Sequence, residues 1–331
     1  MKFSVGYQQR QNPDFLEAIV NNREKISEVY FSWGNYANGR NSQLRQLGIT
    51  PWEAQYRQEA DLTFLSHYGI GMNLLFNGMC YGKDSQSRSF FAGIGDTVAY
   101  IQERMQLGCV TTTSPLIARF IKENFEGIEV RASVNMCIGT VEGMDYIKDY
   151  FDSFYMKREL NRDFSKIREL KDWCDANGKK LYALANSGCL NHCSAHTFHD
   201  NLVAHESEIA QMDNGYVFEG LCRGYLKDPQ NHFALLDRTG FIRPEDVPHF
   251  EGLLSGMKLA TRVSPNPVKI LESYLNGRHV GSTLDLLEPN HTGLIYPWLL
   301  ENSRITSRVE NDKLIYENLE NAMVQLEENL C

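Results

Sequence analysis

Hydrophobic and polar positions along the chain follow two alternating patterns. Short runs rich in β-branched and aromatic residues predict strands, and the segments between them carry apolar residues at three-to-four spacing, as in Ile167, Leu170 and Trp173, which is typical of helices. Strand followed by helix predicts parallel pairing through right-handed crossovers. The eight strand-like runs are 3–7, 28–32, 72–77, 109–113, 128–134, 153–157, 180–186 and 257–262.

Eight such units predict an α/β fold, a closed (β/α)8 TIM-type barrel over residues 1–270. The seventh and eighth runs lie much further apart than the others, which predicts a long insertion after the seventh strand. Long loops after barrel strands usually carry function. We expect residues 271–331 to form a helical C-terminal extension, with an acidic helix near 311–330, that packs on the barrel or on a partner.

The charge balance narrows the classes of partner. The chain has 33 basic and 42 acidic side chains, a formal net charge of −9, and it lacks a block of Lys and Arg, so nucleic-acid binding is disfavoured. The N-terminal residues lack the apolar segment of a signal peptide, and no apolar run is long enough for a membrane span. We therefore expect a cytoplasmic protein whose eight cysteines are not in disulfides.

Four of the cysteines are candidate metal ligands. The runs M-N-L-L-F-N and L-Y-A-L-A-N both continue into N-x-x-C, which ends at Cys80 and at Cys189. Cys193 follows in C-L-N-H-C, and Cys222 lies further along the same insertion between two glycines. Strand ends of a parallel barrel meet at one rim, so the four thiols are expected to converge. Thiolates are preferred ligands of zinc and iron–sulfur clusters.

Two alternatives at this site remain open. Cys137, after the fifth strand, could supply the fourth ligand in place of Cys80. Zinc could be held by two cysteines together with two of the histidines at 192, 196 and 199. A radical-SAM motif is disfavoured, because His196 occupies the place where C-x3-C-x2-C needs its third cysteine.

Polar residues after the other strands predict a binding cavity for a small anionic substrate. Arginine binds carboxylates through paired donors, so several arginines around one cavity favour such a ligand. The expected substrate-binding residues are Arg131, Arg162, Asn186 and Arg262, from a wider set that includes Asn161, Asp163, Arg243, Glu245 and Lys258. No G-x-S-x-G, H-E-x-x-H or G-x-x-x-x-G-K-[ST] motif is present, so no catalytic residue is assigned.

Five stretches resemble the collagenase-like peptidase family: L-N-R-D-F, L-A-N-S-G-C-L-N-H-C, E-G-L-C-R, F-I-R-P-E-D and M-K-L-A-T-R. The family also includes iron–sulfur proteins of oxygen-independent hydroxylation. The resemblance covers residues 1–275 and implies a [4Fe-4S] cluster, with Cys80 as an early ligand, Cys189 and Cys193 as a late pair, and Cys222 before F-I-R-P-E-D. The chain departs from the family where K-L-A-T-R replaces K-I-E-G-R, and in having fewer thiols after the seventh strand.

These observations support three hypotheses. The leading one is an iron–sulfur barrel enzyme that carries out an oxygen-independent hydroxylation or a related redox modification of a small anionic molecule. The second is a peptidase or another hydrolase, with zinc or without a metal. The third is a non-catalytic scaffold subunit that binds a protein partner, or a second copy of the chain, through its C-terminal helices.

Overall fold

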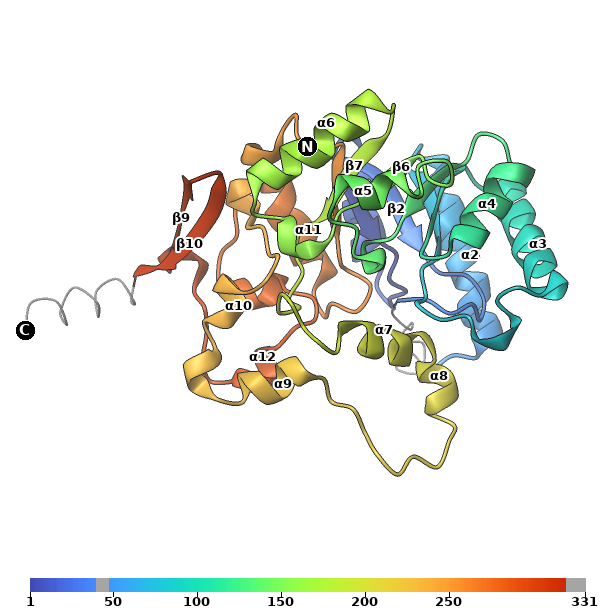
Figure 1. The fold of residues 1–331 in the computed structure, drawn as a ribbon. Coiled ribbons are helices and arrows are strands. Elements are labelled where there is room, and N and C mark those ends of the chain that lie inside the picture. The colour runs from blue at the N-terminus through green and yellow to red at the C-terminus, as the bar shows by residue number, and fades with distance from the viewer. Residues whose placement is uncertain (40–47, 320–331) are drawn as a thin grey trace, which may run out of the picture.

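The computed structural model describes residues 1–39 and 48–319. Eight parallel strands close into a barrel in chain order, and each overlaps one of the predicted runs, so the predicted fold class is confirmed (Figure 1). The strands are β1 (Phe3–Gly6), β2 (Ile26–Phe31), β3 (Gly71–Phe76), β4 (Leu107–Thr112), β5 (Glu129–Ala132), β6 (Ser153–Tyr155), β7 (Lys180–Leu184) and β8 (Gly256–Leu259).

Helices cover the outside of the barrel, one after each strand except β7. Several begin where a polar side chain accepts a backbone hydrogen bond, as Thr50, Ser114 and Asp163 do. Their apolar faces are buried against the strands, which gives the barrel its outer core. The helices are α1 (Asp14–Asn21), α2 (Pro51–His67), α3 (Arg88–Arg104), α4 (Pro115–Asn124), α5 (Val141–Asp145), α6 (Phe164–Ala176) and α11 (Pro267–Asn276). Within the described ranges, no helix is both long and apolar enough to cross a membrane.

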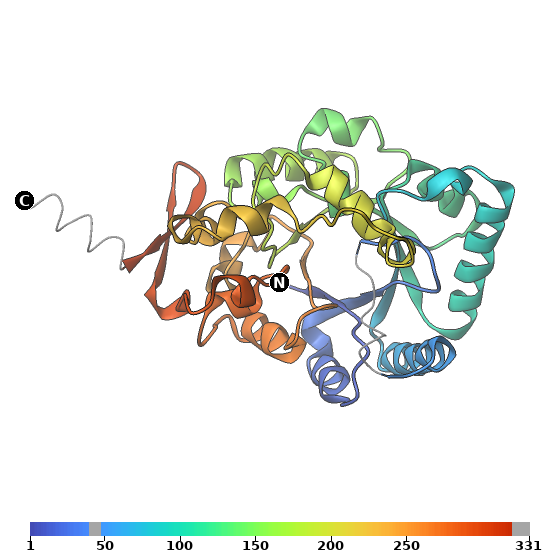
Figure 2. The same ribbon diagram turned by 90° about the horizontal axis from the view of Figure 1, so that it is seen from below.

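The predicted insertion after β7 is present. It holds α7 (His196–Ala204), α8 (Glu206–Ile209), α9 (Leu221–Leu226) and α10 (Ala234–Asp237), and α7 to α9 lie along one side of the barrel (Figures 1 and 2). The chain leaves and returns at one point, which we call the neck: Leu190 and Thr239 form an antiparallel bridge, and the Asn191 amide donates to the Arg238 carbonyl at 2.6 Å. A short 3-10 segment, Pro244–Phe250, then leads into β8.

The C-terminal region differs from its prediction. After α11 and α12 (Thr292–Ile295) the chain forms an antiparallel hairpin, β9 (Ile305–Glu310) and β10 (Lys313–Asn318), where the sequence predicted helix from residue 311. Asn311 and Asp312 both have positive φ, which these residue types tolerate, and they form a two-residue turn. Residues 320–331, the rest of the predicted acidic helix, lie outside the described residues.

The hairpin packs on the barrel through backbone contacts. The Leu314 amide donates to the Arg162 carbonyl at 2.9 Å, and the Phe164 amide donates to the Asp312 carbonyl at 2.7 Å. Leu314 and Tyr316 on β10 are buried, which is the alternation of a strand with one face against a core. The domain boundary at residue 270, and an interface with a partner, stay predictions.

The barrel interior contains a set of paired polar side chains, here called the interior network. Arg131 donates to Glu28 at 2.5 Å and to Glu129 at 2.7 Å. Asn73 donates to the Glu28 carboxylate at 2.8 Å, and the Ser153 hydroxyl donates to Glu129 at 2.6 Å. Buried charges are costly unless they are paired, and here each has a partner. The network therefore closes the middle of the barrel.

Candidate functional site

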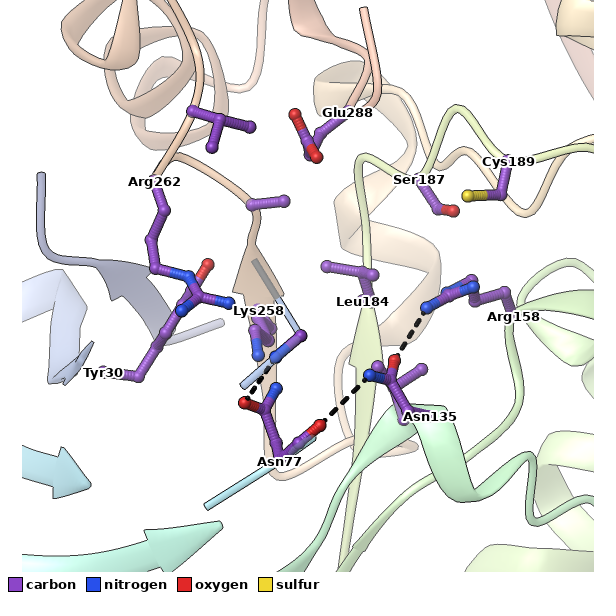
Figure 3. Close-up of a pocket in the computed structure, with 14 residues that line it drawn as sticks. Tyr30, Asn77, Asn135, Arg158, Leu184, Ser187, Cys189, Lys258, Arg262 and Glu288 are labelled. Atoms are coloured by element: carbon purple, nitrogen blue, oxygen red, sulfur yellow. Dashed lines mark hydrogen bonds between the residues drawn. The ribbon is translucent and has the colours of Figure 1, made fainter. Parts of the chain in front are cut away.

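A pocket of about 530 Å³ opens at the C-terminal ends of the barrel strands, and we call it the rim pocket (Figure 3). This is the end of a (β/α)8 barrel at which active sites occur, and part of the volume is open to solvent. The lining residues come from strand ends and from the loops that follow them. They are Tyr30, Gly39, Asn77, Val134, Asn135, Arg158, Leu184, Ser187, Cys189, Lys258, Ala260, Arg262, Val263 and Glu288.

The rim pocket carries an excess of positive side chains. Arg158, Lys258 and Arg262 face a single carboxylate, that of Glu288, among the described lining residues. Asn135 orients Arg158 by accepting a hydrogen bond from its Nη2 at 3.0 Å, and Asn38 accepts one from Arg262 Nη1 at 3.3 Å. The arrangement favours a ligand with a negative charge.

Lys258 is buried at the inner side of the pocket, on β8. Its Nζ lies 4.0 Å from the ring centroid of Tyr30 and 5.4 Å from that of Tyr155. The Tyr30 hydroxyl is fixed by a 2.8 Å hydrogen bond to the Leu259 carbonyl. Burial, together with the positive charge of Arg262, lowers the pKa of Lys258 from its ordinary value of 10.5 to about 7. Near neutral pH, this side chain is thus divided between ammonium and free amine.

Two lining atoms are buried without a partner in the described part of the chain. They are the Ser187 hydroxyl and Nε of Arg158. Buried polar atoms in folded proteins are nearly always hydrogen-bonded, to protein groups or to water. Two such atoms at one pocket therefore indicate that a ligand or ordered water supplies the missing partner.

The structure places one of the four predicted substrate-binding residues, Arg262, in the rim pocket. Arg131 belongs to the interior network. Arg162 donates to the carbonyls of Asp237 and Thr239 at 3.0 and 2.9 Å, away from the pocket lining. Asn186 donates to the Ala260 carbonyl and accepts from the Ala260 amide, at 2.9 and 2.7 Å.

Sequence reasoning missed Arg158 and Ser187, and it left Lys258 in the wider set. Arg158 follows the sixth strand in K-R-E-L, and Ser187 follows the seventh in N-S-G-C. Both stand directly after a predicted strand, which is the signal that could have identified them. Arg131, by contrast, lies in the middle of the predicted run 128–134 and inside β5, so it does not follow a strand.

Three of the predicted metal ligands share one neighbourhood. Cys189 lines the rim pocket, and the pKa of Cys222 is raised by burial and by the nearby thiols of Cys189 and Cys193. Thiols that influence one another in this way suit a polynuclear cluster, whose ligands need not all meet at one ion. In the described residues, no three side chains of His, Cys, Asp or Glu have the geometry to hold a single metal ion.

The two candidates for the fourth ligand each contact a histidine of the insertion. Cys80 is hydrogen-bonded to His205, which lowers the pKa of the thiol, and His205 Nδ1 lies 2.7 Å from a Glu208 oxygen. Cys137 Sγ lies 3.5 Å from His196 Nδ1, and the His196 amide donates to the Cys193 carbonyl at 3.1 Å. Cys137 is therefore joined to the Cys193 loop through His196.

The fold and the site define a (β/α)8 barrel with a charged pocket and neighbouring thiols at one rim. Comparison with known proteins makes the class more specific. No family model matches the chain. It is 27% identical, over 69% of its length and 67% of the relative, to an uncharacterized protease of Methanocaldococcus jannaschii. The solved structure of a U32 peptidase superposes with a TM-score of 0.54 at 11% identity, over 78% of this chain and 92% of that one, which shows the shared fold. These findings confirm the resemblance to the collagenase-like, or U32, peptidases.

Proposed function

We propose that this protein is an iron–sulfur barrel enzyme that binds a small anionic molecule in the rim pocket and modifies it by redox chemistry of the oxygen-independent hydroxylation type. One observation carries the proposal: Cys189 belongs both to the pocket lining and to the group of thiols with Cys193 and Cys222. A centre held there would adjoin the bound substrate.

Cys189, Cys193 and Cys222 would hold a [4Fe-4S] cluster, with Cys137 as the fourth ligand and Cys80 as its alternative. Such a cluster supplies single electrons when all its irons carry thiolates, and a Lewis acid when one iron is open. A single zinc ion suits these residues less well, because it needs a convergent tetrahedral set, and the described residues contain no such set.

The side chains of the pocket account for binding and for proton transfer. Arg262 and Arg158 would bind the anionic part of the substrate through charge-assisted hydrogen bonds. Lys258 can hold or release a proton at Nζ near neutral pH, because its pKa is about 7.

Anaerobic purification followed by iron, sulfide and zinc analysis tests the proposal. We expect a coloured protein with iron and sulfide in equal amounts, and a loss of most of both in Cys222→Ala. Cys174→Ala is the matched control, since Cys174 is buried in α6 on the outside of the barrel and does not line the rim pocket. Comparing Cys137→Ala with Cys80→Ala identifies the fourth ligand. Stoichiometric zinc without sulfide would exclude the cluster.

Peptide hydrolysis is the second candidate, and a specific arrangement favours it. Cys80, His205 and Glu208 form a hydrogen-bonded chain with the order of nucleophile, base and orienting carboxylate. The names of the two relatives, a protease and a peptidase, point the same way. Cleavage of a peptide library that is lost in Cys80→Ala and kept in Cys222→Ala would establish it. Equal cleavage by both variants would remove Cys80 from the reaction.

A further inference from the structure

Lys258 differs from the other charged groups inside the barrel. Arg131, Glu28 and Glu129 all form ion pairs. Lys258 is buried on β8, and its Nζ lies over the rings of Tyr30 and Tyr155. In the described part of the chain, no carboxylate forms an ion pair with it. An unprotonated amine in this position has a lone pair available to react, and it lines the rim pocket.

The groups around this amine match one class of ligand. Arg262 lines the same pocket and is close enough to lower the pKa of Lys258, and Arg158 contributes in the same direction. The unpartnered Ser187 hydroxyl and Arg158 Nε offer further polar contacts. A carboxylate would meet the arginines, and a carbonyl next to it would reach the amine. A small oxo acid carries both groups.

We propose that Lys258 is a covalent binding site that forms a Schiff base with the carbonyl of a small oxo acid held in the rim pocket. This inference goes beyond the proposed function and does not rest on a metal centre. No sequence motif identifies this site, because it depends on the position of Lys258 on β8 and on the side chains around it.

The reaction balances without an oxidant or a reductant. The lone pair of Nζ forms a bond to the carbonyl carbon, and the π electrons of the C=O bond move to oxygen. Proton transfer from nitrogen to oxygen gives a neutral carbinolamine. A proton from solvent on the hydroxyl oxygen lets it leave as water, and the nitrogen lone pair forms the protonated C=N bond. The arginines hold the carboxylate throughout. The cationic C=N group can then withdraw electrons from the neighbouring carbon of the bound acid.

Reductive trapping on the full-length, anaerobically purified protein tests the inference. The protein is incubated with glyoxylate, pyruvate or 2-oxoglutarate in the presence of cyanoborohydride, and the intact mass and peptide map are measured. We expect one adduct per chain, at Lys258, with at least one of the three acids. Acetone, which has the carbonyl and lacks the carboxylate, should react about tenfold more slowly, because it lacks a charge-assisted contact with arginine.

Two variants and a pH series provide the controls. Lys258→Met should abolish the adduct, and Lys166→Met, which alters an exposed lysine of α6, should leave it unchanged. Arg262→Gln should slow trapping of the oxo acid about tenfold more than it slows trapping of acetone. Both rates fall near neutral pH, because loss of the Arg262 charge raises the pKa of Lys258. In the wild type the rate of trapping should rise with pH through about 7 and then level off. This measurement uses the wild-type protein alone, so it does not depend on the folding of a variant.

Two results would overturn the inference: adducts spread over surface lysines equally in wild type and Lys258→Met, or no adduct with any of the three acids. Trapping in Cys222→Ala separates this inference from the proposed function. If the cluster proposal fails and the covalent site is correct, Lys258 is still labelled. If the covalent site fails and the cluster is present, iron and sulfide are found without the label.

Discussion

The interior network and the rim pocket share strand β2, on which Glu28 belongs to the first and Tyr30 to the second, yet they differ in how their polar atoms are satisfied. In the network, Arg131 makes ion pairs with two carboxylates and a hydrogen bond with Ser153. In the pocket, Ser187 and Arg158 keep unpartnered atoms in the described chain, and Lys258 contacts aromatic rings. The comparison separates polar groups that stabilise the fold from polar groups that are available to a ligand.

Removing the central cation of the network should give the largest effect. Arg131→Met leaves Glu28 buried without a cation, while Glu129 keeps its ion pair with Lys180; the loss costs about 3–5 kcal/mol of unfolding free energy. Urea unfolding measures the change. Lys166→Met, which breaks an exposed pair with Glu169, should cost less than about 1 kcal/mol. Equal costs for the two variants would mean that the network does not support the barrel.

The pH dependence of stability should distinguish the pocket from the network. The pKa of Lys258 is about 7 in the folded protein and 10.5 as its ordinary value, so the folded protein binds fewer protons than the unfolded chain between these pH values. The unfolding free energy should therefore rise with pH across this window, by at most about 1.4 kcal/mol for each pH unit. The difference between wild type and Lys258→Met, followed by urea unfolding, isolates this contribution. A constant difference would contradict the lowered pKa.

Ligand binding should depend on the pocket arginine, with little change in stability. Arg262→Gln removes one charge-assisted contact, so the affinity for a small carboxylate such as pyruvate should fall about tenfold or more. Isothermal calorimetry measures the affinity, and urea unfolding should show a change within about 1 kcal/mol. Tight binding to the variant would place the anion elsewhere.

A matched pair of serines gives the smallest and sharpest test. Ser153→Ala removes a hydroxyl that accepts from Arg131 and donates to Glu129, and should cost about 1–3 kcal/mol. Ser187→Ala removes a buried hydroxyl that has no partner among the described residues, and should be near neutral or slightly stabilising. If both alanine variants lose the same stability, the two regions do not differ in the way described.

The sequence predicted the barrel well because local patterns determine it. Each strand run is short, apolar and separated from the next by a helical pattern, so strand order and parallel pairing follow. The C-terminal hairpin differs from the prediction because the acidic composition of residues 311–330 favours a helix. The N-D pair between V-E and K-L-I-Y is the local signal for a two-residue hairpin turn, and both residues have positive φ.

The site was harder to predict because it depends on side-chain surroundings. The spacing of Cys189 and Cys193 in the sequence indicates a local pair. The proximity of Cys222 to this pair depends on how the insertion folds, which the sequence pattern does not show. Arg131 and Arg262 look alike in sequence, yet one is paired inside the barrel and the other lines the pocket. No periodic pattern reports whether a buried cation has a carboxylate beside it, so Lys258 could not be singled out.

The neck has a consequence for how the chain could be engineered. Leu190 and Thr239 are paired in an antiparallel bridge, so the two ends of the segment between them lie side by side. The segment can therefore be removed without moving either end. A short Gly-Ser joint could replace it, because closing a loop whose ends already meet is easy. Such a trimmed chain would keep Lys258 and Arg262 on β8 and the loop after it, and would lack Cys193 and Cys222. The barrel side of the pocket and the thiols of Cys193 and Cys222 thus belong to separate segments, which meet where Arg158 Nη1 lies 2.7 Å from His196 Nε2.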